Sequence, residues 1–147
     1  MKLPAQVVVV PVDFSEMSLQ AVAEARDLAT DAAGLHVVHV VHVLPPILAT
    51  EPGVIWGRVD DRSRTEHALN ALKKVLTEQG FGEVHVDVRV SASGNAAFEI
   101  VRFAEEIGAN LICLPSHGRH GLSRLAIGSV AERVVRFAHC PVLVLRP

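Results

Sequence analysis

The sequence is poor in three features that each mark a different class of protein: paired cysteines, long apolar runs and an excess of basic residues. Its two cysteines, Cys113 in an apolar run and Cys140 before a proline, lack CxxC spacing. They therefore predict neither a disulfide scaffold nor a metal site. No apolar run reaches the roughly 18–20 residues that span a bilayer, so we expect no membrane partner. The net charge is −2 and the pI is near 6.4, so the protein lacks the excess of basic residues that nucleic-acid binding needs, and we expect no nucleic-acid partner.

The first residues also lack the features of a secretion signal. Residues 1–6 contain no charged leader followed by a long apolar stretch and a small-residue cleavage site. They lead directly into a segment with the composition of a core strand. We therefore expect the protein to stay in the cytoplasm.

What the sequence does contain is enough apolar residues for a folded core. Half of the residues are apolar and only 20% are charged, whereas disordered chains show the opposite balance. A length of 147 residues suits one compact domain with a sizeable core. Because we find no repeat and no linker-like segment, we expect a single domain over residues 1–147.

Five short apolar segments have the composition of strands. Residues 6–12 include the β-branched run VVVVPV, which is typical of a strand buried on both faces in a parallel sheet. The other predicted strands are residues 35–43, residues 84–91, Leu111–Pro115 and Val142–Leu145.

Four amphipathic stretches alternate with these strands. Apolar residues recur at three- and four-residue spacing within residues 21–29, 68–76, 97–107 and 130–138. Ser15 is a suitable N-cap for the first helix, which we expect to end near Gly34. Gly80 and Gly108 are suitable ends for the second and third helices. Pro141 prevents the fourth helix from continuing.

This alternation predicts an α/β domain. The order βαβαβαβαβ is typical of a parallel sheet with right-handed crossovers and helices on both faces. Residues 45–61 fit no element, and a loop of that length is usually functional or mobile. A lid and a plain surface connection are both compatible with this segment.

Two segments follow strands at the carboxyl edge of the sheet, where open α/β proteins bind ligands. Residues 13–15 follow the first strand, and residues 116–121 (SHGRHG) follow the fourth. Gly128 and Ser129 begin the next helix, whose free N–H groups and dipole favour phosphate. Neither a P-loop nor a GxGxxG fingerprint is present. The residues alone thus leave open an anion-binding loop or glycines that serve only turns.

Motifs along the whole chain resemble the universal stress protein family. The V-P-V-D-F-S run at residues 10–15 is similar to the start of that family, and residues 37–41 are similar to its second strand. The sequence SHGR at residues 116–119, Gly128-Ser129 and the closing CPVLVL at residues 140–145 resemble its C-terminal signature. Each motif is weak alone, but together they cover the chain in the order that the family shows.

The resemblance implies a Rossmann-like, adenine-nucleotide alpha-hydrolase-like fold, with a doubly wound five-stranded parallel sheet of order 3-2-1-4-5. It also implies a cytoplasmic stress-response or regulatory protein that binds ATP, or AMP or ADP, at the carboxyl ends of strands 1 and 4. Mg²⁺ would accompany the phosphates of ATP. Asp13 would contact the ribose hydroxyls or a metal, and the backbone of Val40 would meet the adenine. The remaining nucleotide-binding positions would be Pro115, Gly118, Gly128, Ser129 and Val130.

Two of these positions carry alternatives. Asp13 could equally be a carboxylate that helps to cap the first helix. Nucleotide-binding members of the family carry G-x-x-G-(nine residues)-G-[ST], and Pro115 stands at the first glycine. Proline has no backbone N–H and fixes φ near −65°. A nucleotide-binding dimeric switch and an interaction module of the same fold without nucleotide binding therefore both remain open.

An adenylating or ATP-hydrolysing enzyme is the least favoured reading. No Ser-Gly-Gly phosphate loop follows the first strand, and no lysine accompanies the candidate loop. His117 has no serine or cysteine paired with it in the sequence pattern, so it suggests no catalytic triad. We expect no enzyme activity beyond slow ATP hydrolysis.

Two further expectations concern the strands. His36, His39 and His42 recur every third residue, but on a strand His39 faces away from the other two, which lie about 20 Å apart. They therefore predict no shared metal site.

Val142–Leu145 would form an uncharged edge strand of the kind that proteins seldom leave bare. Family members often pair this strand across a two-fold axis, so we expect a homodimer.

Overall fold

A computed structural model describes residues 3–43, 61–117 and 127–146. The predicted loop over residues 45–61 lies outside these ranges except for its last residue, and Gly118 lies outside them as well. The strands are β1 (Val8–Pro11), β2 (Leu35–His42), β3 (His85–Ser91), β4 (Leu111–Pro115) and β5 (Val142–Leu145). The helices are α1 (Glu16–Leu28), α2 (Asp61–Glu78), α3 (Ala96–Glu106) and α4 (Ser129–Phe137), and a 3₁₀ helix η1 (Ala32–Gly34) precedes β2.

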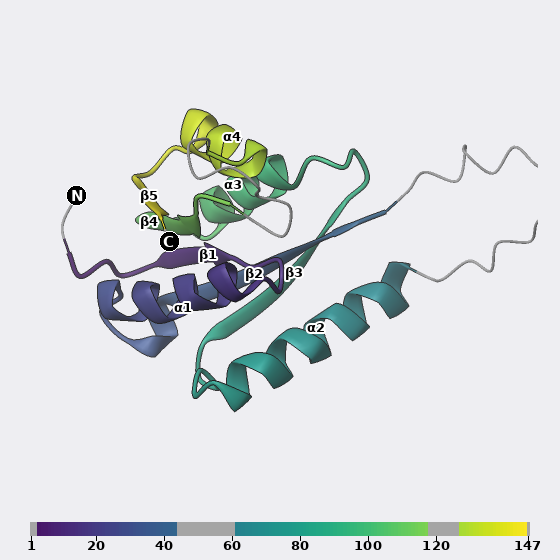
Figure 1. Cartoon of the computed structure of the whole chain (residues 1–147), viewed down its shortest axis with the longest axis horizontal. Helices are drawn as coiled ribbons and strands as arrows, with labels where there is room; N and C mark the ends of the chain where they lie inside the picture. The colour runs from purple at the N-terminus through teal and green to yellow at the C-terminus, as the bar shows by residue number, and fades with distance from the viewer. Residues whose placement is uncertain (1–2, 44–60, 118–126, 147) are drawn as a thin grey trace, which may run out of the picture.

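The strands form one parallel sheet of order β3-β2-β1-β4-β5, which confirms the predicted topology. Helices α1 and α2 cover one face, and α3 and α4 cover the other (Figure 1). Val8 and Val10 of β1 pack on the side of α1 and α2, whereas Val9 packs on the side of α3 and α4. This alternation explains the continuous apolar run of the first strand, because both of its faces are buried.

The ends of most helices follow the sequence signals. Ser15 is the N-cap of α1, and its Oγ accepts a hydrogen bond from the backbone N–H of Ser18 at 3.2 Å. Gly80 and Gly108 follow α2 and α3 with φ values of 83° and 65°, which glycine adopts without strain. The sequence rules for caps therefore locate these boundaries.

The predicted end of the first helix is wrong. The helix α1 stops at Leu28 instead of continuing to Gly34, because the chain after it joins the N-terminal segment. Thr30 donates from its backbone N–H to the carbonyl of Ala5 at 2.9 Å. A Cβ atom at Gly34 would lie 2.2 Å from the carbonyl oxygen of Gln6. Gly34 thus permits this close approach and does not end the helix.

Among the described residues, no helix combines the length and the apolar composition needed to cross a membrane.

Candidate functional site

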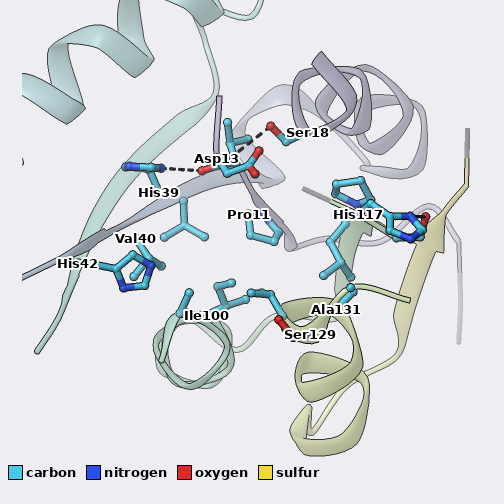
Figure 2. A pocket seen from close by; sticks show the side chains of 18 residues that line it. Pro11, Asp13, Ser18, His39, Val40, His42, Ile100, His117, Ser129 and Ala131 are labelled. Atoms are coloured by element: carbon cyan, nitrogen blue, oxygen red, sulfur yellow. Dashed lines mark hydrogen bonds between the residues drawn. The ribbon is translucent and has the colours of Figure 1, made fainter. Parts of the chain in front are cut away.

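A cavity of about 510 Å³ lies at the carboxyl ends of β1, β2 and β4 (Figure 2). The strands β1 and β4 are neighbours, but the helices that follow them, α1 and α4, cover opposite faces of the sheet. The winding direction reverses at this point, which is where open α/β sheets bind ligands. The volume falls within the range of about 300–1,000 Å³ that is usual for small-molecule sites.

Two prolines explain why β1 and β4 part at this end. Val12 N donates to Val38 O on β2 at 2.8 Å, and Ser116 N donates to Leu145 O on β5 at 2.7 Å. Because successive residues of a strand direct their N–H groups to opposite sides, position 11 faces β4 and position 115 faces β1. Both positions are proline, so neither can donate to the other strand. The register of β1 with β4 accordingly covers only Val8↔Leu111 and Val9↔Ile112.

The structure brings six of the seven predicted site residues to this cavity, and the seventh, Gly118, lies outside the described residues. The six are Asp13, Val40, Pro115, Gly128, Ser129 and Val130. Their role as ligand contacts stays a prediction. The sequence did not indicate that Pro11, His42 and Ile100 also line the cavity. The strand order and the direction of each side chain place them there.

Asp13 lies in the turn between β1 and α1. Its Oδ1 accepts hydrogen bonds from the backbone N–H of Ser15 at 3.0 Å and from Ser15 Oγ at 2.5 Å. These hydrogen bonds match the alternative role expected from the sequence, in which the Asp13 carboxylate supports the start of α1. Phe14 has a φ of 64°, in the left-handed region that non-glycine residues seldom adopt. The turn directs Asp13 toward the cavity while it holds the N-cap residue.

The end of β2 offers backbone groups to the cavity. Val38 O accepts from Val12 N, so by alternation the N–H and C=O of Val40 point to the same side, beyond the end of β1. His39 Nδ1 lies 2.7 Å from Val12 O. Since a carbonyl oxygen only accepts, Nδ1 carries the proton, and the ring of Phe14 lies against this imidazole with 4.8 Å between centroids. The backbone of Val40 thus presents a donor and an acceptor at the crevice.

The N-terminus of α4 forms the opposite wall. Gly128 N donates to Ser116 O at 2.7 Å, which ties the start of the helix to the end of β4. A Cβ atom at position 128 would lie 3.1 Å from Ser116 O, so glycine permits this close approach. Gly128 is the N-cap residue and has no side chain that could cap the helix. The first-turn N–H groups of Ser129 and Val130 are consequently suited to an anion.

His117 differs from its prediction. The sequence suggested no paired nucleophile, but His117 Nδ1 lies 2.9 Å from the hydroxyl of its neighbour Ser116. Ser116 is only 2% exposed, although both residues are among those that line the cavity. This contact joins the residue that follows β4 to its neighbour at the edge of the cavity.

The described lining residues carry little formal charge. Asp13 is the only carboxylate among them, and they include no lysine or arginine. In the described part of the chain no group of three or more potential metal ligands exists. Mg²⁺ is commonly held by one or two carboxylates together with substrate phosphates, so Asp13 suits a phosphate-bound Mg²⁺ and no independent metal site.

The histidines on β2 are separated by the sheet. His39 packs with Phe14 on the side of α1, whereas His36 stacks on His85 with 4.6 Å between ring centroids and lies edge-on to Phe103 of α3. Burial and the neighbouring His85 lower the pKa of His36, and Asp87 opposes this shift.

Comparisons with known proteins agree with this fold. The model of the universal stress protein family matches residues 4–146. A universal stress protein of Methanocaldococcus jannaschii is 37% identical over 142 residues, which cover 95% of this chain and 81% of that protein.

Two solved structures share the fold. One is described as a universal stress protein in complex with cAMP; it has 22% identity, a TM-score of 0.63 and 97% coverage of both chains. The other is the universal stress protein from Archaeoglobus fulgidus in complex with dAMP. It has 23% identity and a TM-score of 0.56, and the match covers 95% of this chain and 96% of that one.

Proposed function

The chain belongs to the universal stress protein family, and we propose that it binds an adenine nucleotide in the crevice and acts as a regulatory dimeric switch. One observation carries this proposal. A single cavity is lined by the N-terminus of α4, whose N-cap Gly128 has no side chain, by the carboxylate of Asp13 and by Val40 at the end of β2. These three elements supply groups that suit a phosphate, a ribose and a base. The relatives described with cAMP and dAMP support the same class of ligand.

In this arrangement the phosphates lie against the first turn of α4, where the N–H groups and the hydroxyl of Ser129 donate. Gly118 belongs to the same phosphate-binding loop in the proposal. Asp13 accepts from the ribose hydroxyls, and the backbone of Val40 pairs with the edge of the adenine. ATP, ADP and AMP all satisfy this scheme, and Mg²⁺ would be held by the phosphates of ATP with Asp13 as the available carboxylate.

Regulation is favoured over catalysis because the described residues supply few catalytic groups. Oδ1 of Asp13 already accepts two hydrogen bonds from Ser15, which makes this oxygen a poor base for activating a water. No lysine or arginine among the described lining residues would stabilise a transferring phosphoryl group. Slow ATP hydrolysis is the most that we propose.

Pairing of two copies through β5 completes the proposal. Among the described strands Val142–Leu145 pairs with β4 alone, and its four residues are all half-buried. Phe137, just before this strand on α4, is 65% exposed. A second copy that added its own β5 would cover this edge and the apolar surface beside it. We place this dimer in the cytoplasm, and light scattering and cell fractionation test the two statements separately.

Pro115 favours a second candidate function, an interaction module of the same fold that does not bind nucleotides. Its ring replaces the glycine of the nucleotide-binding pattern and removes a donor from the floor of the crevice. The two candidates differ in whether ligand reaches the cavity, and not in fold or assembly.

Copurification and a thermal-shift panel distinguish them. The protein is purified, denatured and analysed by chromatography for released nucleotide, and the stripped protein is then heated with AMP, ADP or ATP with and without Mg²⁺. We expect a saturable rise of the melting temperature with adenine nucleotides. An empty protein whose melting temperature no nucleotide raises would support the interaction module. A gain of binding by Pro115→Gly alone would assign that loss to the proline.

A further inference from the structure

We infer that the imidazole of His42 stacks against the face of the bound base and thereby determines the affinity of the site for an aromatic nucleobase. The inference rests on the proposed function and adds a residue that the nucleotide-loop pattern does not contain. It concerns the end of the cavity opposite α4.

The strand places His42 on the correct face of the sheet. His42 is the last residue of β2, and it shares a face with Val38 and Val40 because side chains alternate along a strand. Val38 and Val40 pack toward α3 and α4, so His42 lies on that side as well. Figure 2 shows Val40 and His42 together on β2 at one side of the cavity and Ser129 on α4 at another.

The cavity has an order of polarity along its length. At α4 the backbone N–H groups favour an anion. The lining also includes the carboxylate of Asp13 and the apolar residues Pro11 and Ile100, and Ile100 is 3% exposed. At the far side the exposed imidazole of His42 follows. A ligand with a phosphate at one end and a flat ring at the other matches this order.

The backbone of β2 determines how such a ring would lie. The N–H and C=O of Val40 point sideways within the sheet, beyond Val12, so a base that pairs with them lies roughly in the plane of the sheet. One face of that base is then turned toward α3 and α4, which is the side that carries His42. Stacking is the interaction that an aromatic side chain makes from this position.

The two histidines at this end of β2 differ in their hydrogen bonds within the described residues. His39 is fixed by its hydrogen bond to Val12 O and by the ring of Phe14. No hydrogen bond to another described residue restrains the imidazole of His42. Its register partner on β3, Ser91, is fully buried.

Isothermal titration of AMP into the wild type, His42→Ala and His42→Phe tests the inference. Loss of base stacking weakens binding by about 5- to 100-fold, so we expect that loss for His42→Ala. His42→Phe retains an aromatic face, and its Kd should stay within about threefold of the wild-type value. His85→Ala is the matched control: it removes an exposed histidine on the same side of the sheet, outside the cavity, and should leave the Kd unchanged.

The outcomes separate this inference from the proposed function. An AMP affinity within twofold of wild type in His42→Ala overturns the inference and leaves the nucleotide site intact. A His42→Phe variant as weak as His42→Ala also overturns it, because a polar contact rather than stacking is then lost. If the wild type does not bind AMP at all, both the proposed function and the inference fail. Thermal melts of each variant verify that it is folded.

Discussion

Replacing Gly128 with valine tests whether the start of α4 depends on close contact with the end of β4. The nearest atoms to a Cβ at this position are Ser116 O at 3.1 Å and His117 Cα at 3.6 Å. Both are backbone atoms, so neither can move aside by a side-chain rotation. The peptide of Ser116 is also held from both directions, since its N–H donates to Leu145 O and its carbonyl accepts from Gly128 N, each at 2.7 Å.

The cost of the substitution follows from this crowding. The helix start has to shift by a few tenths of an ångström, and the two further methyl groups of valine add to the overlap. Overpacking of this kind costs about 1–3 kcal/mol in the free energy of unfolding. For a domain of this size that corresponds to a melting temperature about 3–10 °C lower. A displaced helix start also moves the N–H groups that we assign to phosphate, so we expect AMP binding to weaken at least tenfold, as for a lost charge-assisted hydrogen bond.

Gly82→Val provides the matched control. A Cβ at Gly82 would meet only the side chain of Thr77, at 3.7 and 3.8 Å, which is ordinary contact. Urea unfolding and calorimetric titration of both variants decide the point. If Gly128→Val is as stable as Gly82→Val and binds AMP with the wild-type affinity, the reasoning about the helix start is refuted.

Three other predictions concern the core, acid stability and thiol reactivity. Phe103 is 1% exposed, so Phe103→Ala should lower the free energy of unfolding by about 3–5 kcal/mol in urea titrations, and a loss below 1 kcal/mol would contradict the packing described. Folding lowers the pKa of His36, so the unfolded chain binds a proton at this residue more tightly than the folded chain does. The free energy of unfolding should therefore fall as the pH drops through about 6.5. His36→Gln should reduce that pH dependence in calorimetry between about pH 8 and 5. Burial raises the pKa of the Cys113 thiol to about 12. A thiol reagent at pH 8 should therefore modify Cys140 first and Cys113 only in denaturant. Equal modification rates of the two cysteines in the folded protein would count against this burial.

The sequence predicted the fold well where a local signal and the tertiary structure agree. Continuous β-branched runs identify strands buried on both faces, and Ser15, Gly80 and Gly108 mark helix ends by their own capping chemistry. The prediction that the first helix ends near Gly34 was wrong because this glycine serves a tertiary contact. It makes room for the carbonyl of Gln6, which is distant in sequence.

The candidate site was predictable only in part for the same physical reason. Asp13 and Gly128 lie in short motifs that can be recognised without knowing the neighbouring strands. The effect of Pro11 and Pro115, which stops β1 and β4 from pairing at the crevice, can be inferred only from the strand order and the direction of each backbone N–H group. The position of His42 at the cavity depends on which face of β2 meets α3, and a histidine in an apolar strand gives no such indication by itself.

Calorimetric titration of AMP and ATP into nucleotide-free wild-type protein tests the central claim most directly. We predict saturable binding of one nucleotide per chain, competition between the two nucleotides for that site, and loss of affinity in Gly128→Val. The absence of binding heat for both nucleotides, in a protein that melts cooperatively, would contradict the account of the crevice as a nucleotide site.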